Sequence, residues 1–221
     1  NGQTSSPAVV LSEASGDHWR PAMCKDGRGH LWATWAEGDK GKWDIWGSFL
    51  ADGKWSAAIR LTRGAGNSFG QKLAVDKAGM LWMTWQSVVK DNYEVLLAAI
   101  KPEGLGEPLN VSRNPASDWE PAIAAAKDGR VFVAWDSYRS GSYDILLAEL
   151  KDGKLSEPMG IATSPAYEAH ASLAVDHQDR LWIAWDNGGV RWGEDNEDGR
   201  KLHSERSVEI RCLANGELAE P

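Results

Sequence analysis

The chain has 221 residues, of which 42% are hydrophobic and 25% charged, and its formal net charge is −8 at pH 7. This composition is typical of a globular protein, and no apolar run approaches the roughly 20 residues of a membrane-spanning helix. The negative charge argues against a general binder of nucleic acid or of anionic membranes, because both need a basic surface.

Tryptophan recurs at intervals of 50 residues and divides the chain into four similar units. One column is Trp35, Trp85, Trp135 and Trp185, and a second, three residues earlier, is Trp32, Trp82, Phe132 and Trp182. Tryptophans that recur at the same position of every repeat indicate residues that pack the fold rather than residues that stack on a sugar. We therefore predict one domain over residues 1–221, with repeats at about 12–61, 62–111, 112–161 and 162–221.

The first expected element is a short strand at residues 7–11, PAVVL, which aligns with EPLNV and EPMGI at the ends of later repeats. It is thus a fourth strand with no first three strands before it. The last repeat stops at GELAEP, before its own fourth strand. We expect the N-terminal strand to complete the last repeat and close a ring, which would leave no open sheet edge.

Each repeat that follows has four short β-rich stretches separated by Gly, Asp, Asn and Ser, as tight turns require. In the third repeat the expected strands are Ala122–Ala126, Arg130–Trp135, Asp144–Leu150 and Pro158–Ala162. Four-stranded units repeated about every 50 residues are typical of a β-propeller, an all-β fold. The two aromatic columns, three residues apart on one strand, should point to opposite faces of each blade.

The pattern D-x-x-G-x-L-W-x-x-W, followed by a D/E-I strand and a D-G-K-W/L turn, resembles bacterial sialidase-like and TolB-like propeller repeats. The resemblance implies a propeller fold, and the repeat count gives four blades, which form a ring alone, share a larger ring with a second copy or belong to a longer propeller. The Asp-box pattern S-x-D-x-G-x-x-W is absent and no sialidase arginine triad can be placed. The resemblance therefore implies no catalytic residues. The repeats are also similar to those preceding a metal-dependent phosphoesterase domain in large secreted bacterial proteins, which implies an accessory domain in a secreted or periplasmic protein.

The loops that enter the blades differ in their polar residues, and loops on a rigid scaffold commonly carry binding sites. They read His18-Trp19-Arg20, Ser68-Phe69-Gly70, Asp118-Trp119-Glu120 and Glu168-Ala169-His170. An aromatic residue in three of the four indicates packing. The polar residues should lie near the mouth of the central channel, where they either bind a polar ligand or metal or pair with one another in solvent. The candidates for ligand binding are His18, Arg20, Asp118, Glu120, Glu168 and His170.

Asp136 and Asp186 directly follow the repeated tryptophan in the last two units. A pair of carboxylates at one face permits glycosidase acid–base chemistry, and the alternative is that both stabilise turns.

The last repeat carries about 13 extra residues near positions 187–205, including Arg191, Trp192 and an acidic run. The run suggests calcium only loosely, because it lacks the ligand spacing of an EF-hand, so we expect no metal or cofactor. Trp192 falls outside both tryptophan columns. It is expected to cap the channel, stack on a ligand or contact a partner protein.

The sequence thus favours a non-catalytic propeller module, a monomer or homodimer, that binds a protein or carbohydrate ligand at the channel mouth. The alternatives are a small glycan hydrolase using the carboxylates of that face, a lectin using Trp192, and the accessory domain of a phosphoesterase. The two cysteines, Cys24 and Cys212, are expected to be free and buried.

Overall fold

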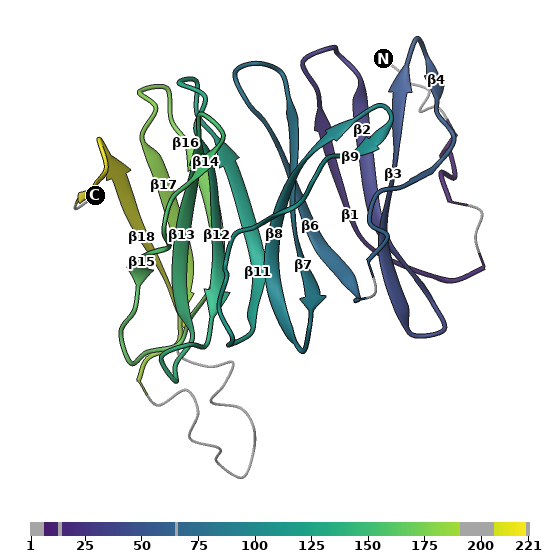
Figure 1. Ribbon diagram of the computed structural model, residues 1–221. Coiled ribbons are helices and arrows are strands. Elements are labelled where there is room, and N and C mark those ends of the chain that lie inside the picture. Colours follow the sequence, from purple (N-terminus) through teal and green to yellow (C-terminus); the bar gives the residue numbers. More distant parts are fainter. Residues whose placement is uncertain (1–6, 13–14, 65, 191–205, 220–221) are drawn as a thin grey trace.

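The computed structural model describes residues 7–12, 15–64, 66–190 and 206–219. Within these ranges the protein is built of strands and turns without a helix, and it forms four antiparallel sheets that stand side by side (Figure 1). No helix of the described residues is long and apolar enough to cross a membrane. The predicted all-β class is therefore confirmed.

The sheets follow one another along the chain, and each begins with three long strands. Sheet 1 comprises β1 (Asp17–Lys25), β2 (Leu31–Asp39), β3 (Lys42–Ala51), β4 (Lys54–Trp55) and β5 (Ile59–Arg60). Sheet 2 comprises β6 (Ser68–Val75), β7 (Leu81–Val89), β8 (Asn92–Lys101), β9 (Gly104–Leu105) and β10 (Leu109–Asn110). Sheet 3 comprises β11 (Asp118–Ala125), β12 (Val131–Ser137), β13 (Asp144–Lys151), β14 (Lys154–Leu155) and β15 (Met159–Ala162). Sheet 4 comprises β16 (Glu168–Val175), β17 (Leu181–Asn187), β18 (Ser207–Ala214) and β19 (Glu217–Ala219).

The strands expected in the third repeat agree closely with β11, β12, β13 and β15. The main difference is that β11 starts at Asp118, four residues before the predicted start. Its pairing with β12 continues past an irregularity between Trp119 and Ala122, where the register shifts. Such a bulge interrupts the alternation of side chains, so the sequence pattern shows only the regular part of the strand.

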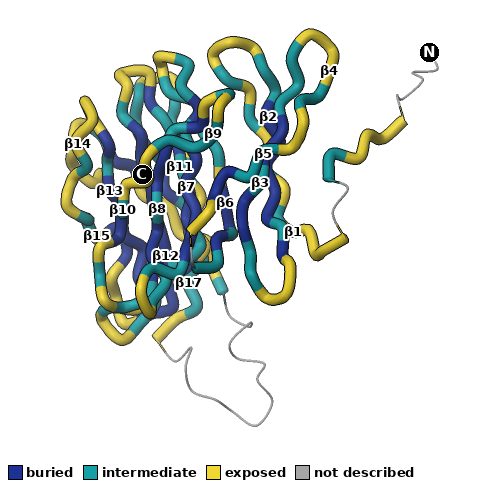
Figure 2. Tube along the Cα trace, turned by 45° about the vertical axis from the view of Figure 1, so that its right-hand side comes forward, coloured by how far each residue is buried: buried dark blue, intermediate teal, exposed yellow. Residues whose placement is uncertain are grey.

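The core lies between neighbouring sheets, and Figure 2 shows the buried segments running through the middle of the row. Trp85 packs with residues of sheet 1, whereas Trp82 packs against the cluster shared with sheet 3. The two aromatic columns thus point to opposite faces, as predicted. Because sheets 2 and 3 are covered on both faces, their central strands can be apolar on both sides.

Sheet 4 differs from the others on the face that has no following sheet. Val208 pairs with Asp186 in the same register as Ile45, Val95 and Ile145 with their partners. Those three side chains are 0% exposed, yet Val208 is 76% exposed and Ile210, further along β18, is 46% exposed. An apolar surface of the kind that packs between the other sheets is therefore open to solvent here.

The structure shows no closed sheet. Residues 7–12 form no strand, and sheet 4 consists of β16–β19 alone. Ser12 instead lies on sheet 1, where its hydroxyl contacts His18 and lies 3.5 Å from the Glu37 carboxylate. The predicted completion of the last repeat by residues 7–11 is thus not seen in the described residues. Both cysteines are free as expected, but only Cys212 is buried, and Cys24 is half-buried.

Candidate functional site

The first strands of the four sheets, β1, β6, β11 and β16, line a common space of about 300 Å³. Each of these strands has a register shift at the same place, as in Trp19–Ala22 of β1 and Trp119–Ala122 of β11. The residue inside the bulge has a left-handed backbone in every sheet: Arg20 (φ 48°), Gly70 (φ 71°), Glu120 (φ 43°) and His170 (φ 60°). Non-glycine residues in this conformation are strained, and such strain gathers where a side chain must be re-aimed for function.

Arg20 and Glu120 meet although they belong to sheets 1 and 3. The Nη1 of Arg20 donates to both carboxylate oxygens of Glu120, at 2.6 and 2.7 Å. The guanidinium carbon lies 4.2 Å from the centre of the Trp19 ring, and Gln71 Nε2 donates to the Arg20 carbonyl at 2.6 Å. This ion pair bridges sheets 1 and 3, and both side chains remain about one-third exposed. The bulge residues come just before the residues that line the common space, and we call this end of it the mouth.

Asp136 joins sheet 3 to sheet 4 from a buried position. Its two carboxylate oxygens accept the backbone N–H of His170 at 2.9 and 3.0 Å. Gln86, at the same place in sheet 2, likewise accepts the backbone N–H of Glu120 at 3.1 Å. The side chain after the repeated tryptophan therefore holds the bulge residue of the next sheet.

The charge state of Asp136 is unusual for an aspartate. Asp136 is 2% exposed. Burial raises its pKa to about 7, and the negative charge of Glu120 adds to this, against the lowering by the backbone and imidazole of His170. The Asp136 carboxyl therefore gains or loses its proton near neutral pH.

His170, Asp186 and Arg206 form the part of the cluster on sheet 4. His170 Nδ1 lies 3.0 Å from Asp186 Oδ2, and Arg206 Nη1 donates to the same oxygen at 3.4 Å. Arg206 also covers the ring of Tyr167, 4.4 Å from its centre, and Tyr143 lies 5.0 Å from Tyr167 between ring centres. Aromatic rings thus stand beside the exposed charged groups, a combination that suits a polar ligand with apolar faces.

The structure brings five of the predicted site residues together: Arg20, Glu120, Asp136, His170 and Asp186. Three others have partners elsewhere. Asp118 is fully buried and accepts from Trp135 and Arg139, Glu168 accepts from the backbone and hydroxyl of Ser164, and His18 lies on sheet 1 near Glu37. Arg191 and Trp192 lie outside the described residues.

Sequence reasoning missed Gln86, Tyr143, Tyr167 and Arg206. Gly70 was the available signal for the bulge, because glycine in a column of larger residues indicates a left-handed backbone. Nothing in the repeat pattern marked Arg206, which follows the insertion. Among the described residues, no three His, Cys, Asp or Glu side chains are grouped so as to hold a metal ion.

No protein-family model matches the chain, and neither does any curated protein. Solved structures do share its fold. A protein of unknown function from Dyadobacter fermentans has a TM-score of 0.68 at 11% identity over 95% of this chain and 64% of its own. The Hadza microbial sialidase Hz136 has a TM-score of 0.64 at 14% identity, over 92% and 46%. The α-L-arabinanase of Penicillium chrysogenum, complexed with arabinobiose, has a TM-score of 0.60 at 13% identity, over 91% and 62%.

These similarities show that the four sheets have a propeller fold of the sialidase-like and arabinanase-like kind. The chain spans less than two thirds of each of these three proteins. At such low identity the likeness concerns the fold alone. The predicted resemblance to sialidase-like repeats is confirmed at that level.

Proposed function

We propose that the protein hydrolyses a glycan at the mouth of the central channel, with Glu120 and Asp186 as the carboxylates that face the substrate. The observation that carries the proposal is the convergence of these two groups with Asp136, whose pKa is raised to about 7. Glycoside hydrolysis commonly needs two carboxyl groups, one able to give a proton and one ionised. The raised pKa of Asp136 shows that this part of the protein disfavours a further negative charge, which is the condition under which one carboxyl of a pair keeps its proton.

The residues have different parts in this proposal. Glu120 and Asp186 are each about one-third exposed, so a substrate can reach them. Asp136 is buried and acts as a positioning residue, because it fixes the backbone of His170 and so the imidazole that pairs with Asp186. Arg20 and His170 are donors for sugar hydroxyls, and Tyr143 and Tyr167 supply aromatic faces.

Two further considerations support hydrolysis over a non-catalytic module. Proteins that share the fold include a sialidase and an arabinanase, so the scaffold is compatible with glycan chemistry. A simple scaffold would also have little reason to keep strained residues at the same point of successive sheets. The four sheets serve here as consecutive blades of a propeller, each presenting one bulge residue at the mouth.

The test is release of nitrophenol from aryl α-L-arabinofuranoside, β-D-xyloside and α-sialoside, together with product analysis on arabino-oligosaccharides. The wild type is expected to cleave at least one substrate, and Glu120→Gln and Asp186→Asn to lose at least a hundredfold in kcat/KM. Glu217→Gln, an exposed carboxylate on β19, is the matched control and should retain full activity. Binding of these glycans without any cleavage would overturn hydrolysis and return the protein to the class of binding modules.

A further inference from the structure

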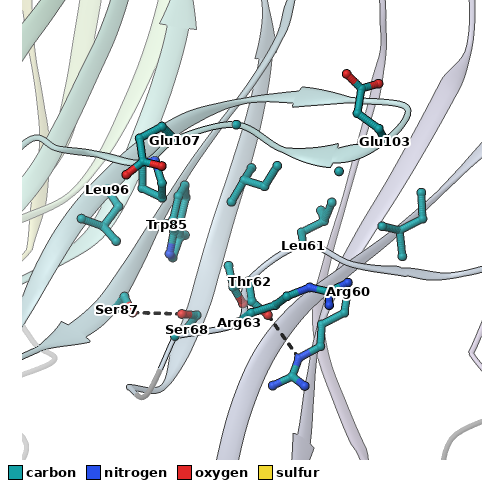
Figure 3. A pocket seen from close by; sticks show the side chains of 16 residues that line it. Arg60, Leu61, Thr62, Arg63, Ser68, Trp85, Ser87, Leu96, Glu103 and Glu107 are labelled. Atoms are coloured by element: carbon teal, nitrogen blue, oxygen red, sulfur yellow. Dashed lines mark hydrogen bonds between the residues drawn. The ribbon is translucent and has the colours of Figure 1, made fainter.

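A second cavity, of about 480 Å³, lies at the junction of sheets 1 and 2, away from the mouth cluster. It is lined by residues 59–64 of sheet 1 and by β7, β8 and the segment 103–108 of sheet 2 (Figure 3). This volume falls in the usual range for small-molecule sites, about 300–1,000 Å³. Figure 3 shows Arg60 and Arg63 on one side of the cavity and Glu103 and Glu107 on the other.

Trp85 provides a donor without an acceptor in this cavity. Its side chain is 2% exposed and lines the cavity, and its buried Nε1 has no hydrogen-bond partner among the described residues. In Figure 3 the ring nitrogen is directed to the side where Ser68 and Ser87 lie. The hydroxyls of those serines bond to each other at 2.9 Å. A buried N–H left unpaired costs about 1–3 kcal/mol, so its persistence suggests that an acceptor from outside the chain satisfies it.

The equivalent junction of sheets 2 and 3 has the same architecture with its donor satisfied. There Trp135 Nε1 donates to Asp118 Oδ1 at 3.1 Å, and Asp118 stands where sheet 2 has Ser68. The shorter side chain of Ser68 bonds to Ser87 and not to Trp85. The indole donor at the junction of sheets 1 and 2 is therefore unpaired, whereas its equivalent at the junction of sheets 2 and 3 is paired.

The two junctions also differ in whether the arginine at the rim of the junction is paired. At the junction of sheets 2 and 3, Arg113 Nη2 donates to the Ser156 carbonyl at 3.1 Å and lies 3.4 Å from Glu157 Oε1. The corresponding residues one repeat earlier are Arg63 and Glu107. Arg63 makes no ion pair within the part of the chain that the structure describes, whereas Arg60 is paired with Asp44. An exposed, uncompensated cation therefore stands at the entrance of the cavity.

The junction of sheets 3 and 4 provides a contrast. Trp185 Nε1 is also without a partner in the described residues. There Arg211 donates to the carbonyl of Ile161, and its guanidinium carbon lies 5.9 Å from the centre of the Trp185 ring. A side chain of the protein thus occupies that junction. The first junction combines a free indole donor, a free arginine and a cavity.

We propose that this cavity binds a small polyhydroxylated carboxylate of the size of a hexuronic acid. Its carboxylate would accept from Trp85 Nε1 and be attracted by Arg63, because an anion satisfies both the unpaired N–H and the unpaired guanidinium. Its hydroxyls would donate to Glu103 and Glu107 on the opposite side. The site is separate from the channel mouth and does not depend on the proposed hydrolysis.

The test uses D-galacturonate as the probe and D-galactose, which has the same ring without the carboxylate, as the matched ligand. Calorimetry should show galacturonate binding at least tenfold more tightly than galactose. The indole N–H resonance that Trp85→Phe removes from the NMR spectrum should shift downfield on titration. Equal affinity for the two sugars, or an unshifted Trp85 resonance, would overturn the proposal.

Three variants test whether galacturonate binds in this cavity or elsewhere on the protein. Arg63→Gln should weaken galacturonate binding at least tenfold, whereas Arg113→Gln, its equivalent one repeat later, should leave it unchanged. Glu120→Gln should also leave it unchanged, because that residue belongs to the mouth. Loss of binding in Glu120→Gln with retention in Arg63→Gln would place the carboxylate at the mouth and refute the rim site.

Discussion

Val95 and Val208 occupy the same register position in sheets 2 and 4, yet one is 0% and the other 76% exposed. Truncation to alanine removes two methyl groups from each. At Val95 the lost burial is worth about 0.8 kcal/mol per carbon, and the cavity left between sheets 2 and 3 adds to it, so Val95→Ala should cost about 2–3 kcal/mol. At Val208 almost nothing is buried, and Val208→Ala should change stability by less than about 0.5 kcal/mol.

Urea unfolding of both variants beside the wild type gives the comparison, with the midpoint reporting stability and the slope reporting the surface exposed. Because the two substitutions are chemically identical, the difference isolates the environment of the position. A loss at Val208 as large as that at Val95 would mean that the open face of sheet 4 is covered in solution, and it would refute the inference from the exposed β18.

Three other predictions test the core, the buried charge and the strained backbone. Trp135→Ala should lower the free energy of unfolding by about 3–5 kcal/mol, because its ring is fully buried between sheets 2 and 3; unchanged stability with altered ligand binding would contradict its packing role. The native state holds the Asp136 proton more tightly than the unfolded chain, so this group should lower stability by up to about 4 kcal/mol as pH rises from about 4 to 7. Asp136→Asn should flatten the plot of urea midpoint against pH over that range. An identical pH dependence in the variant would disprove the raised pKa. His170→Gly should raise stability by up to about 1 kcal/mol, because glycine adopts the left-handed backbone at φ 60° without strain, and it should impair glycan cleavage because the imidazole is lost. A lower melting temperature of the variant would show that the His170 side chain stabilises the fold by more than its backbone strain costs.

The architecture could be predicted well from the sequence because the residues that pack between the sheets recur at the same position of each repeat. The columns through Trp82 and Trp85 recur every 50 residues, and in the structure these two side chains face different neighbouring sheets. Strand pairing is local in this fold, so hydrophobic alternation and turn residues suffice to mark it. The early start of β11 was missed because the bulge interrupts that alternation.

The candidate site was predictable only in part, since it depends on which side chains meet across sheets. The blade-entry columns predicted that Arg20, Glu120 and His170 lie near the mouth of a central channel, but they did not predict that Arg20 bonds to a residue 100 positions later. Asp118 and Glu168 lie in the same loops, yet they serve buried hydrogen bonds. The alignment of the repeats does not reveal whether a carboxylate faces solvent or the ring nitrogen of a neighbouring tryptophan.

The most direct test of the mouth as a glycan site is a crystal structure of the Glu120→Gln variant soaked with arabinobiose and, separately, with sialic acid. We expect electron density for one of these sugars between the side chain at position 120 and Asp186, in contact with His170 or Arg20. Density for both sugars only outside the mouth, or for neither at saturating concentration, would contradict it.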